Sequence, residues 1–447
     1  MFVLICELIR QNYLIMRKVN LCIIILLFIF TSYGQENFLQ EVTFDKIRGQ
    51  SDIKIINTFA NGDLALVGEN TPVNSEKKNI FVLRSDSKGN IIWIKEFSSD
   101  RILAVNDFLI DDSENIVIVA EQYEDGNRES LFLLGLDDAG TIIFSKHYNE
   151  AGGEIEAYDI TNDKDGGFLI TGFCKLPTLV SNVFFQMIKE EQFLYLLKVD
   201  SIGNKIWSKY IEEDYLSAAG KEIIIDKKSI VNIFSNNHKN NKENVIKLIT
   251  SKDNDTFQEY ILVTDKNAVL SDVAYDGNNF YLTGLLLNEK NDGDNYDIFL
   301  IKLNSEYQVT FSKIIKSDYN DWVTGVLLQN DNIILFGQIN KKGSKKLYSL
   351  ELEKDGTFLS FKTYNTPHQS ITLMDGENTQ EGFLFVGNHW KEKRVGMLLN
   401  ADKLTYNDNE FKIINSNFLL QKSKLGEFRK LNKNETIGPV NLKELKY

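Results

Sequence analysis

The chain has 447 residues, a formal net charge of −13 and an apolar fraction of 43%, which is ordinary for a folded globular protein. Its 29 Phe and 18 Tyr, together with recurring β-branched residues, favour strands over helices, and only 4 Pro argue against long proline-rich linkers. An acidic surface repels phosphate backbones, so nucleic acid is not an expected partner.

Residues 1–34 have the features of a cleaved signal peptide. Arg17 and Lys18 form a short positive region, an apolar run covers residues 21–30, and small residues follow it. This run is too short to span a bilayer as a helix, so we expect cleavage and no transmembrane anchor. Met16 is an alternative start. The sequence therefore predicts export to the periplasm, the cell surface or the medium.

Three cysteines give no disulfide framework. Cys6 and Cys22 lie in the segment expected to be removed, which leaves Cys174 alone. Despite the predicted export, stability must therefore come from the hydrophobic core.

One short block recurs seven times along the chain, with a polar or glycine turn, four apolar-rich positions and usually a final glycine. The copies are residues 62–68, 114–120, 166–172, 228–234, 278–284, 331–337 and 381–387. Successive copies are 50 to 53 residues apart except for one step of 62. Self-similarity at a fixed period of this length predicts a repeat architecture.

Each copy contains further strand patterns around this block. In the first copy an apolar segment at residues 80–84 leads through a glycine turn to a segment with Trp93 and Lys95, and a strand also precedes each block. Lysine recurs in the register of Lys95, with Glu259 in the fourth copy. Four antiparallel strands per repeat predict an all-β, seven-bladed β-propeller of four-stranded blades. Two stacked sandwiches would not keep a single period over the whole chain.

The ends of the repeat region suggest how the ring closes. Residues 38–44 resemble the outer strand of the other copies, although they precede the first full copy, and the seventh copy has no clear outer strand. We therefore expect the N-terminal strand to complete the last blade, with residues 410–415 as the alternative. This divides the chain into a signal peptide, a propeller over residues 35–411, and a basic extension over residues 412–447 that either folds back onto the acidic body or reaches a partner.

The third copy carries a recognisable repeat. Residues 163–172, Asp-Lys-Asp-Gly-Gly-Phe-Leu-Ile-Thr-Gly, and residues 194–209, which end in Gly-Asn-Lys-Ile-Trp-Ser-Lys, resemble the repeat of exported bacterial β-propellers of unassigned function. The resemblance covers residues 38–411 and is weakest in the fourth and seventh copies. It implies a propeller fold and export, and it carries no catalytic residue.

Motifs for cofactors and metals are weak. The four histidines, His147, His238, His368 and His389, lie one to a repeat without zinc-ligand spacing. Carboxylates two residues apart at Asp163 and Asp165, and again within residues 292–297, match only part of a calcium loop. We expect ordinary turns there and no cofactor, with calcium as the alternative.

The first strand of several copies carries acidic residues that would line the central channel of a propeller. The candidates are Asp52, Asp107, Asp159, Asp272 and Asp321. Propeller glycosidases gather catalytic carboxylates from separate blades, so these acids keep an enzymatic hypothesis open. Solvated channel-lining side chains are the simpler interpretation.

Long and dissimilar loops join the second and third strands, whereas the turns before the outer strand are short and alike. Variable loops on a rigid scaffold are typical of a recognition surface. Aromatic or histidine side chains lie in or beside four places of this rim, at Tyr123, Tyr296, His389 and Trp390. In the third copy residues 174–191 form an apolar insertion, which either packs down as a short helix or forms an exposed contact patch.

These patterns favour a non-catalytic, monomeric, exported propeller that binds or scaffolds protein or glycan. The alternative is an envelope or extracellular enzyme of the glycosidase or lyase type, with acids at the channel mouth. A purely structural envelope component is a third hypothesis.

Overall fold

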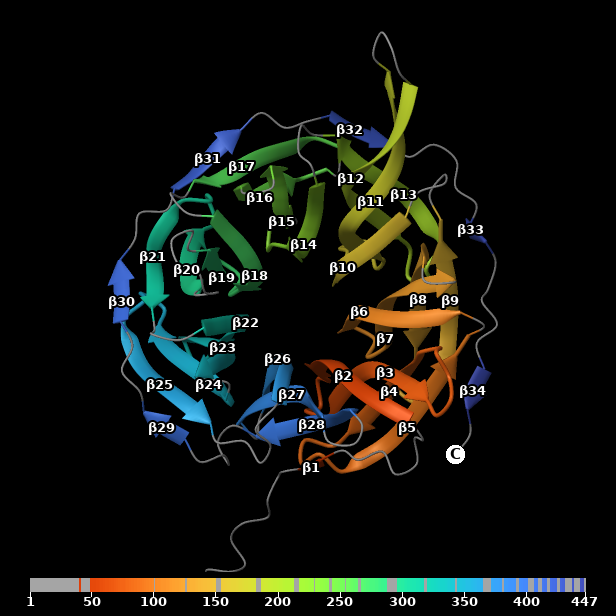
Figure 1. Cartoon of the computed structure of the whole chain (residues 1–447), viewed down its shortest axis with the longest axis horizontal. Helices are drawn as coiled ribbons and strands as arrows, with labels where there is room; N and C mark the ends of the chain where they lie inside the picture. The colour runs from red at the N-terminus through yellow and green to blue at the C-terminus, as the bar shows by residue number, and fades with distance from the viewer. Residues whose placement is uncertain are drawn as a thin grey trace, which may run out of the picture. The chain divides into compact units, whose positions relative to one another are not determined.

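In the computed structural model, the unit Gln40–Tyr447 is a ring of seven antiparallel blades (Figure 1). The structure describes residues 40–41 and 49–445, apart from short internal segments of which the longest is 288–295. The predicted all-β, seven-bladed propeller is confirmed. The expected signal peptide lies outside the described residues, and no helix among the described residues is long and apolar enough to cross a membrane.

Each of the first six blades is built from four strands that follow one another in sequence from the centre of the ring outward. The first three blades are β2 (Gly49–Thr58), β3 (Leu64–Pro72), β4 (Asn79–Ser85) and β5 (Ile91–Ser98); β6 (Ile102–Ile110), β7 (Ile116–Glu124), β8 (Asn127–Leu136) and β9 (Ile142–Tyr148); and β10 (Glu154–Asn162), β11 (Phe168–Ser181), β12 (Gln186–Val199) and β13 (Lys205–Glu212).

The next three blades repeat this order. They are β14 (Ser217–Ile225), β15 (Val231–Asn240), β16 (Glu243–Ser251) and β17 (Phe257–Val263); β18 (Asn267–Tyr275), β19 (Asn279–Leu287), β20 (Tyr296–Asn304) and β21 (Val309–Lys316); and β22 (Asn320–Gln329), β23 (Asn332–Lys341), β24 (Ser344–Glu353) and β25 (Phe358–Tyr364). The recurring sequence block lies at the start of the second strand of each blade. This strand is paired on both sides, and the apolar residues of the block are mostly buried.

The seventh blade has three consecutive strands, β26 (Ile371–Thr379), β27 (Gly382–Trp390) and β28 (Arg394–Asn400). The short strand β1 (Gln40–Glu41) lies antiparallel to β28, with Gln40 opposite Leu398. Residues 412–415, part of the alternative closing strand, pair with β21 of the fifth blade instead. Closure of the ring by the N-terminal strand stays a prediction.

Deletion of residues 36–45 tests this closure. We expect the deletion to lower the melting temperature, because it leaves the backbone groups on the outer edge of β28 unpaired. Thermal melting of the variant beside the intact chain is the measurement. An unchanged midpoint would mean that the ring closes without the N-terminal strand.

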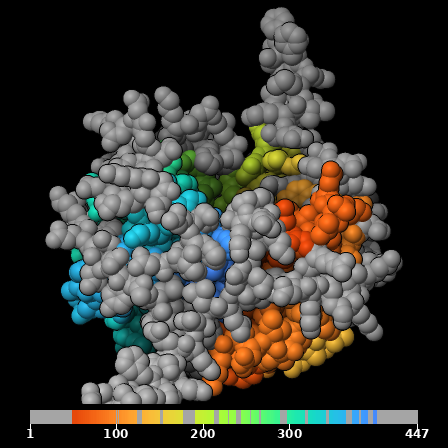
Figure 2. All heavy atoms as spheres, turned by 60° about the horizontal axis from the view of Figure 1, so that its bottom comes forward, coloured from red at the N-terminus to blue at the C-terminus, as the bar shows by residue number. Residues whose placement is uncertain are grey.

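The hydrophobic core lies between neighbouring blades. Val67 and Phe97 of the first blade pack in one cluster with Ile118 and Leu134 of the second, and all four side chains are fully buried. In Figure 2 the blue residues of the seventh blade lie between the cyan residues of the sixth and the red residues of the first. Each blade therefore buries both faces against its neighbours.

The third blade carries the insertion as an extension of its central hairpin. β11 and β12 continue pairing up to Ser181 and Gln186, and the hairpin projects beyond the ring in Figure 1. The expectation of a short helix at residues 174–191 is wrong, because the inserted residues continue the strand pairing that precedes them. Cys174, at the base of the hairpin, is buried.

The C-terminal segment runs along the outside of the ring and adds a fifth strand to six blades (Figure 1). We call these six strands the belt. In chain order they are β29 (Tyr406–Asp408), β30 (Lys412–Asn415), β31 (Leu419–Ser423), β32 (Glu427–Lys430), β33 (Thr436–Ile437) and β34 (Lys443–Leu445). They pair with β25, β21, β17, β13, β9 and β5, so the belt passes the blades in reverse order from the sixth to the first.

Candidate functional site

Three pairs of successive blades contact one another through a motif on the outermost strand of the first blade in each pair. Trp93 and Lys95 of the first blade pack over Gly140 in a turn of the second, where an added Cβ would lie 3.0 Å from Trp93 and 2.9 Å from Lys95. Phe144 and Lys146 make the same contact with Gly203, and Phe311 and Lys313 make it with Gly356. These three glycines have φ angles of +74°, +75° and +84°, a region that side chains with a Cβ rarely adopt.

The joint between the fourth and fifth blades has none of these residue types. The β-bulge on the inner strand fixes which residues of the two blades are equivalent. By this register Leu248 of the fourth blade corresponds to Leu300 of the fifth blade, and Leu300 pairs with Lys313. Leu248 pairs with Tyr260, so Tyr260 occupies the lysine position. The sequence-based placement of Glu259 in that register is wrong by one residue, because the fourth copy has no glycine with which to align it.

The other two residues of the inter-blade motif, the aromatic residue and the turn glycine, are also replaced at this joint. Gln258 takes the position of the aromatic residue on β17, and Tyr307 takes the position of the turn glycine in the fifth blade. The Tyr307 N–H donates to Asn304 O at 2.9 Å, as the Gly203 N–H donates to Asp200 O in the third blade. Tyr307 has a φ of +59°, which costs a tyrosine on the order of 1–2 kcal/mol. Strain of this kind marks a candidate functional residue.

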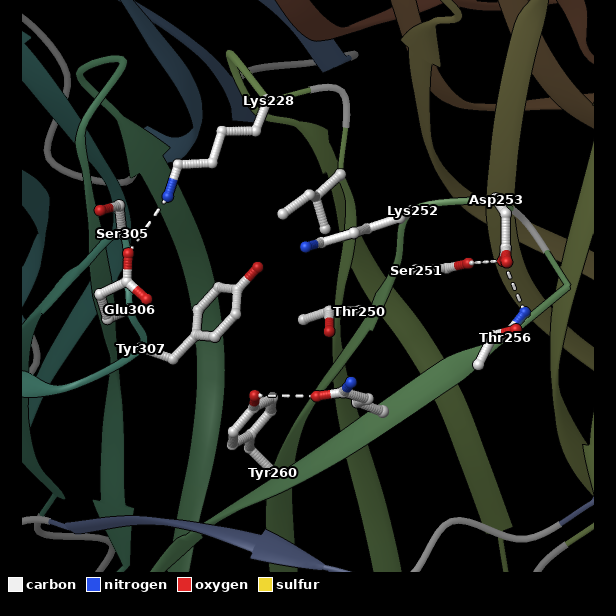
Figure 3. Close-up of a pocket in the computed structure, with 12 residues that line it drawn as sticks. Lys228, Thr250, Ser251, Lys252, Asp253, Thr256, Tyr260, Ser305, Glu306 and Tyr307 are labelled. Carbon is white, nitrogen blue, oxygen red and sulfur yellow. Dashed lines mark hydrogen bonds and ion pairs between the residues drawn. The ribbon is translucent and has the colours of Figure 1, made fainter.

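A pocket of about 400 Å³ lies where the motif is replaced (Figure 3). Gln258, Tyr260 and Tyr307 all line it, and the centroids of the two tyrosine rings are 5.1 Å apart at an interplanar angle of 50°. The remaining lining residues are mostly polar and come from three turns: Lys228, Ile230, Thr250, Ser251, Lys252, Asp253, Thr256, Ser305 and Glu306. Its size suits a small ligand or one end of a chain.

Hydrogen bonds fix both tyrosines in the pocket. The Tyr307 hydroxyl donates to Asn232 Oδ1 at 2.8 Å, and the Tyr260 hydroxyl donates to Gln258 Oε1 at 3.3 Å. Burial raises the pKa of both phenols, so both stay neutral at physiological pH. The pocket therefore offers two partly exposed aromatic rings that are held in place before any ligand arrives.

The inner strands place a second group of polar residues around the centre of the ring. Asp107, Asp159, Asp272 and Asp375 follow the β-bulges of their strands, and Glu222 holds the same position in the fourth blade. Four of them accept a hydrogen bond from a backbone N–H of the next blade. The donors are Ile160 to Asp107 at 3.0 Å, Ile223 to Asp159 at 2.6 Å, Val326 to Asp272 at 2.7 Å and Ile56 to Asp375 at 3.1 Å.

Sequence reasoning found three members of this group and missed two. Asp107, Asp159 and Asp272 occupy equivalent positions, whereas Asp52 and Asp321 precede the bulge and are 8% and 1% exposed. The sequence prediction did not include Glu222 and Asp375. Each stands directly before the inner-strand position that is equivalent to Ile160, and Asp159 stands directly before Ile160 itself. Aligning that position across all seven copies would have found both.

Burial raises the pKa of several of these carboxyls. It raises the pKa of Asp107, where the hydrogen-bonded Asp159 carboxyl adds to the effect, and of Glu222 and Asp272. Burial also raises the pKa of Asp375 to about 7 and that of Glu377 to about 8. Such values suit a general acid, but the bonds to the next blade give most of these carboxyls a structural role.

These shifts predict that stability falls as pH rises. Asp375 and Glu377 have unfolded pKa values of 3.8 and 4.5, so between about pH 4 and 8 the folded state holds protons that the unfolded state has released. We expect the melting temperature to be higher at pH 5.5 than at pH 8.5. Asp375→Asn should flatten this dependence by about 3 °C. A variant with the same pH profile as the intact protein would contradict the assignment.

The structure describes the first of the two predicted calcium positions and only part of the second. Lys198 forms ion pairs with both Asp163 and Asp165, the latter at 2.9 Å. Residues 292–295 lie outside the described residues. In the part of the chain that the structure describes, no three His, Cys, Asp or Glu side chains are placed to hold a metal ion.

The predicted rim lies at the opposite ends of the strands from the pocket. Tyr123 is half-buried and its hydroxyl donates to Glu121, and His389 is buried at 2% exposed. Tyr296 is half-buried, and its ring meets Trp322 edge-on with centroids 5.3 Å apart. Trp322 was not among the predicted residues, although it is 50% exposed. The side chain of Trp390 lies outside the part of the chain that the structure describes.

Comparison with known proteins assigns no family to this chain. The sequence matches no protein-family model and no curated protein. Similar solved structures include a mutant of the NanB sialidase from Streptococcus pneumoniae (9% identity, 81% of this chain, 70% of that chain, TM-score 0.42). They also include the acylaminoacyl peptidase of Pyrococcus horikoshii (14%, 83%, 54%, 0.46) and the endosialidase of phage phi92 (10%, 77%, 74%, 0.40). None of these likenesses assigns an activity to this chain.

Proposed function

We propose that this protein is an exported, non-catalytic β-propeller that binds a glycan through the pocket between its fourth and fifth blades. The observation that carries the proposal is the replacement of the inter-blade motif at all three of its positions, with Gln258, Tyr260 and Tyr307 lining one pocket. A strained tyrosine at a turn where four other blades have a glycine of positive φ is costly for folding alone. The export itself rests on the sequence of residues 1–34.

A glycan suits this pocket better than a folded protein does. Two tyrosine rings offer an apolar surface on which the C–H face of a sugar packs, while hydroxyl, amide and ammonium groups around them match its hydroxyls. The volume of about 400 Å³ holds a small group and not a broad protein surface.

An enzyme of the glycosidase type is the second candidate. The raised pKa values of Asp375 and Glu377 favour it, because a protonated carboxyl at neutral pH is a general acid. Hydrolysis of glycan substrates by the intact protein, lost in Asp375→Asn and in Glu377→Gln, would support this candidate over the binding function.

Calorimetric titration with neutral, amino and acidic oligosaccharides tests the binding function. We expect the intact protein to bind at least one class, and Tyr307→Gly to bind it at least tenfold more weakly. Tyr296→Ala, on the opposite rim, is the matched control and should bind like the intact protein. If no class binds, the proposal fails. If Tyr296→Ala loses binding and Tyr307→Gly keeps it, the ligand site is on the rim.

A further inference from the structure

The charged side chains of the pocket differ in whether they have a hydrogen-bond or ion-pair partner within the protein. Lys228 Nζ pairs with Glu306 at 3.2 Å. The Asp253 carboxylate accepts hydrogen bonds from the backbone N–H groups of Asp255 at 2.9 Å and Thr256 at 2.6 Å. These bonds, above all the one from Thr256, lower the pKa of Asp253 to about 2. Both carboxylates of the pocket therefore already have partners within the protein.

Lys252 differs from the other charged residues. Among the described residues no carboxylate lies within 4.0 Å of its ammonium group. Figure 3 shows the Lys252 side chain directed into the pocket toward the Tyr307 hydroxyl. A lysine ammonium carries three hydrogen-bond donors and no acceptor, so it needs an acceptor from water or from a ligand.

The other polar groups define which ligand atoms fit beside Lys252. The Tyr307 hydroxyl uses its hydrogen on Asn232, and the Tyr260 hydroxyl uses its hydrogen on Gln258 Oε1. The Gln258 amide then presents its NH₂ group as a donor. The pocket thus combines donors at Lys252 and Gln258 with two aromatic rings.

Building on the proposed function, we infer that the ligand is an anionic saccharide. Its sugar ring packs on Tyr260 and Tyr307, and its carboxylate or sulfate group binds Lys252. The protein as a whole has a net charge of −13 and repels anions, so attraction for such a ligand must come from a local cation. A charge-assisted hydrogen bond from Lys252 provides that attraction and gives selectivity over neutral sugars.

Calorimetric titration with oligosaccharides of matched ring type tests this inference. The probes are glucose oligosaccharides, glucuronic acid oligosaccharides and sulfated glucose oligosaccharides. At low salt we expect at least one anionic probe to bind tenfold more tightly than the neutral one, and the better anion identifies the carboxylate or the sulfate. The preference should decrease as salt increases.

Two lysine variants separate a local contact from long-range attraction. Lys252→Gln should bring the anionic and neutral probes to within twofold of each other. Lys88→Gln, an exposed lysine in the corresponding turn of the first blade, should keep the full preference. Equal losses in both variants would overturn the inference. Equal binding of anionic and neutral probes by the intact protein would also overturn it while leaving the glycan-binding function standing, whereas no binding of any probe would remove that function itself.

Discussion

Truncation of the chain after Asn400 is expected to lower the melting temperature by about 5–10 °C and to cause self-association. The belt covers the outer edges of six blades with strands of two to five residues. Its removal exposes six rows of unpaired backbone N–H and C=O groups, which are templates for pairing with another chain. Thermal melting and light scattering over a range of protein concentrations are the measurements.

Shorter truncations act as internal controls for the belt. Removal of residues 446–447 lies beyond β34 and should change nothing. Removal of residues 424–447 strips β32, β33 and β34 from three blades and should give an intermediate loss, because each belt strand contacts a different blade. The account of the belt is wrong if truncation after Asn400 leaves both the melting temperature and the monomeric state unchanged.

A reciprocal exchange at the inter-blade turns should have unequal effects on the melting temperature at two equivalent positions. Gly203→Tyr should lower the melting temperature by about 3–5 °C, because it combines a φ of +75° with a Cβ only 3.0 Å from the buried Phe144 ring. Tyr307→Gly should change it by no more than about 2 °C. There the relief of strain at φ +59° offsets the loss of contacts with Tyr260 and Phe280.

The two variants are compared by thermal melting in the same buffer. Gly203→Ala is the control for Gly203→Tyr, since it introduces the strained φ with only a single methyl group. A large loss of stability in Tyr307→Gly would show that the Tyr307 ring is needed for folding, and the argument that it is kept for binding would then fail.

The sequence predicts the propeller because strand-forming residues recur along the chain at a nearly constant period. The register of the fourth copy was not predictable in the same way. The position equivalent to Gly284 of the fifth blade is Ser235, and without a glycine there the sequence block was aligned one residue too early, on Phe234. Strand pairing settles the register through backbone hydrogen bonds, which the sequence pattern does not contain.

Neither the belt nor the pocket could be predicted from the sequence, and the physical reasons differ. Belt strands are two to five residues long and pair through the backbone, so they need no apolar pattern and only their basic charge stood out. The pocket joins Tyr307 of one blade to Gln258 and Tyr260 of another. No single copy of the repeat displays it, although the missing glycine turns of the fourth copy were visible in the sequence.

Hydroxyl-radical footprinting with and without bound oligosaccharide tests most directly where the ligand binds. Mass spectrometry then compares the oxidation of Tyr260 and Tyr307 with that of Tyr296 and Trp322, which form the aromatic pair on the opposite rim. The pocket account predicts that ligand protects Tyr260 and Tyr307 and leaves Tyr296 and Trp322 unchanged. Protection of Tyr296 and Trp322 without protection of Tyr260 and Tyr307 would contradict it.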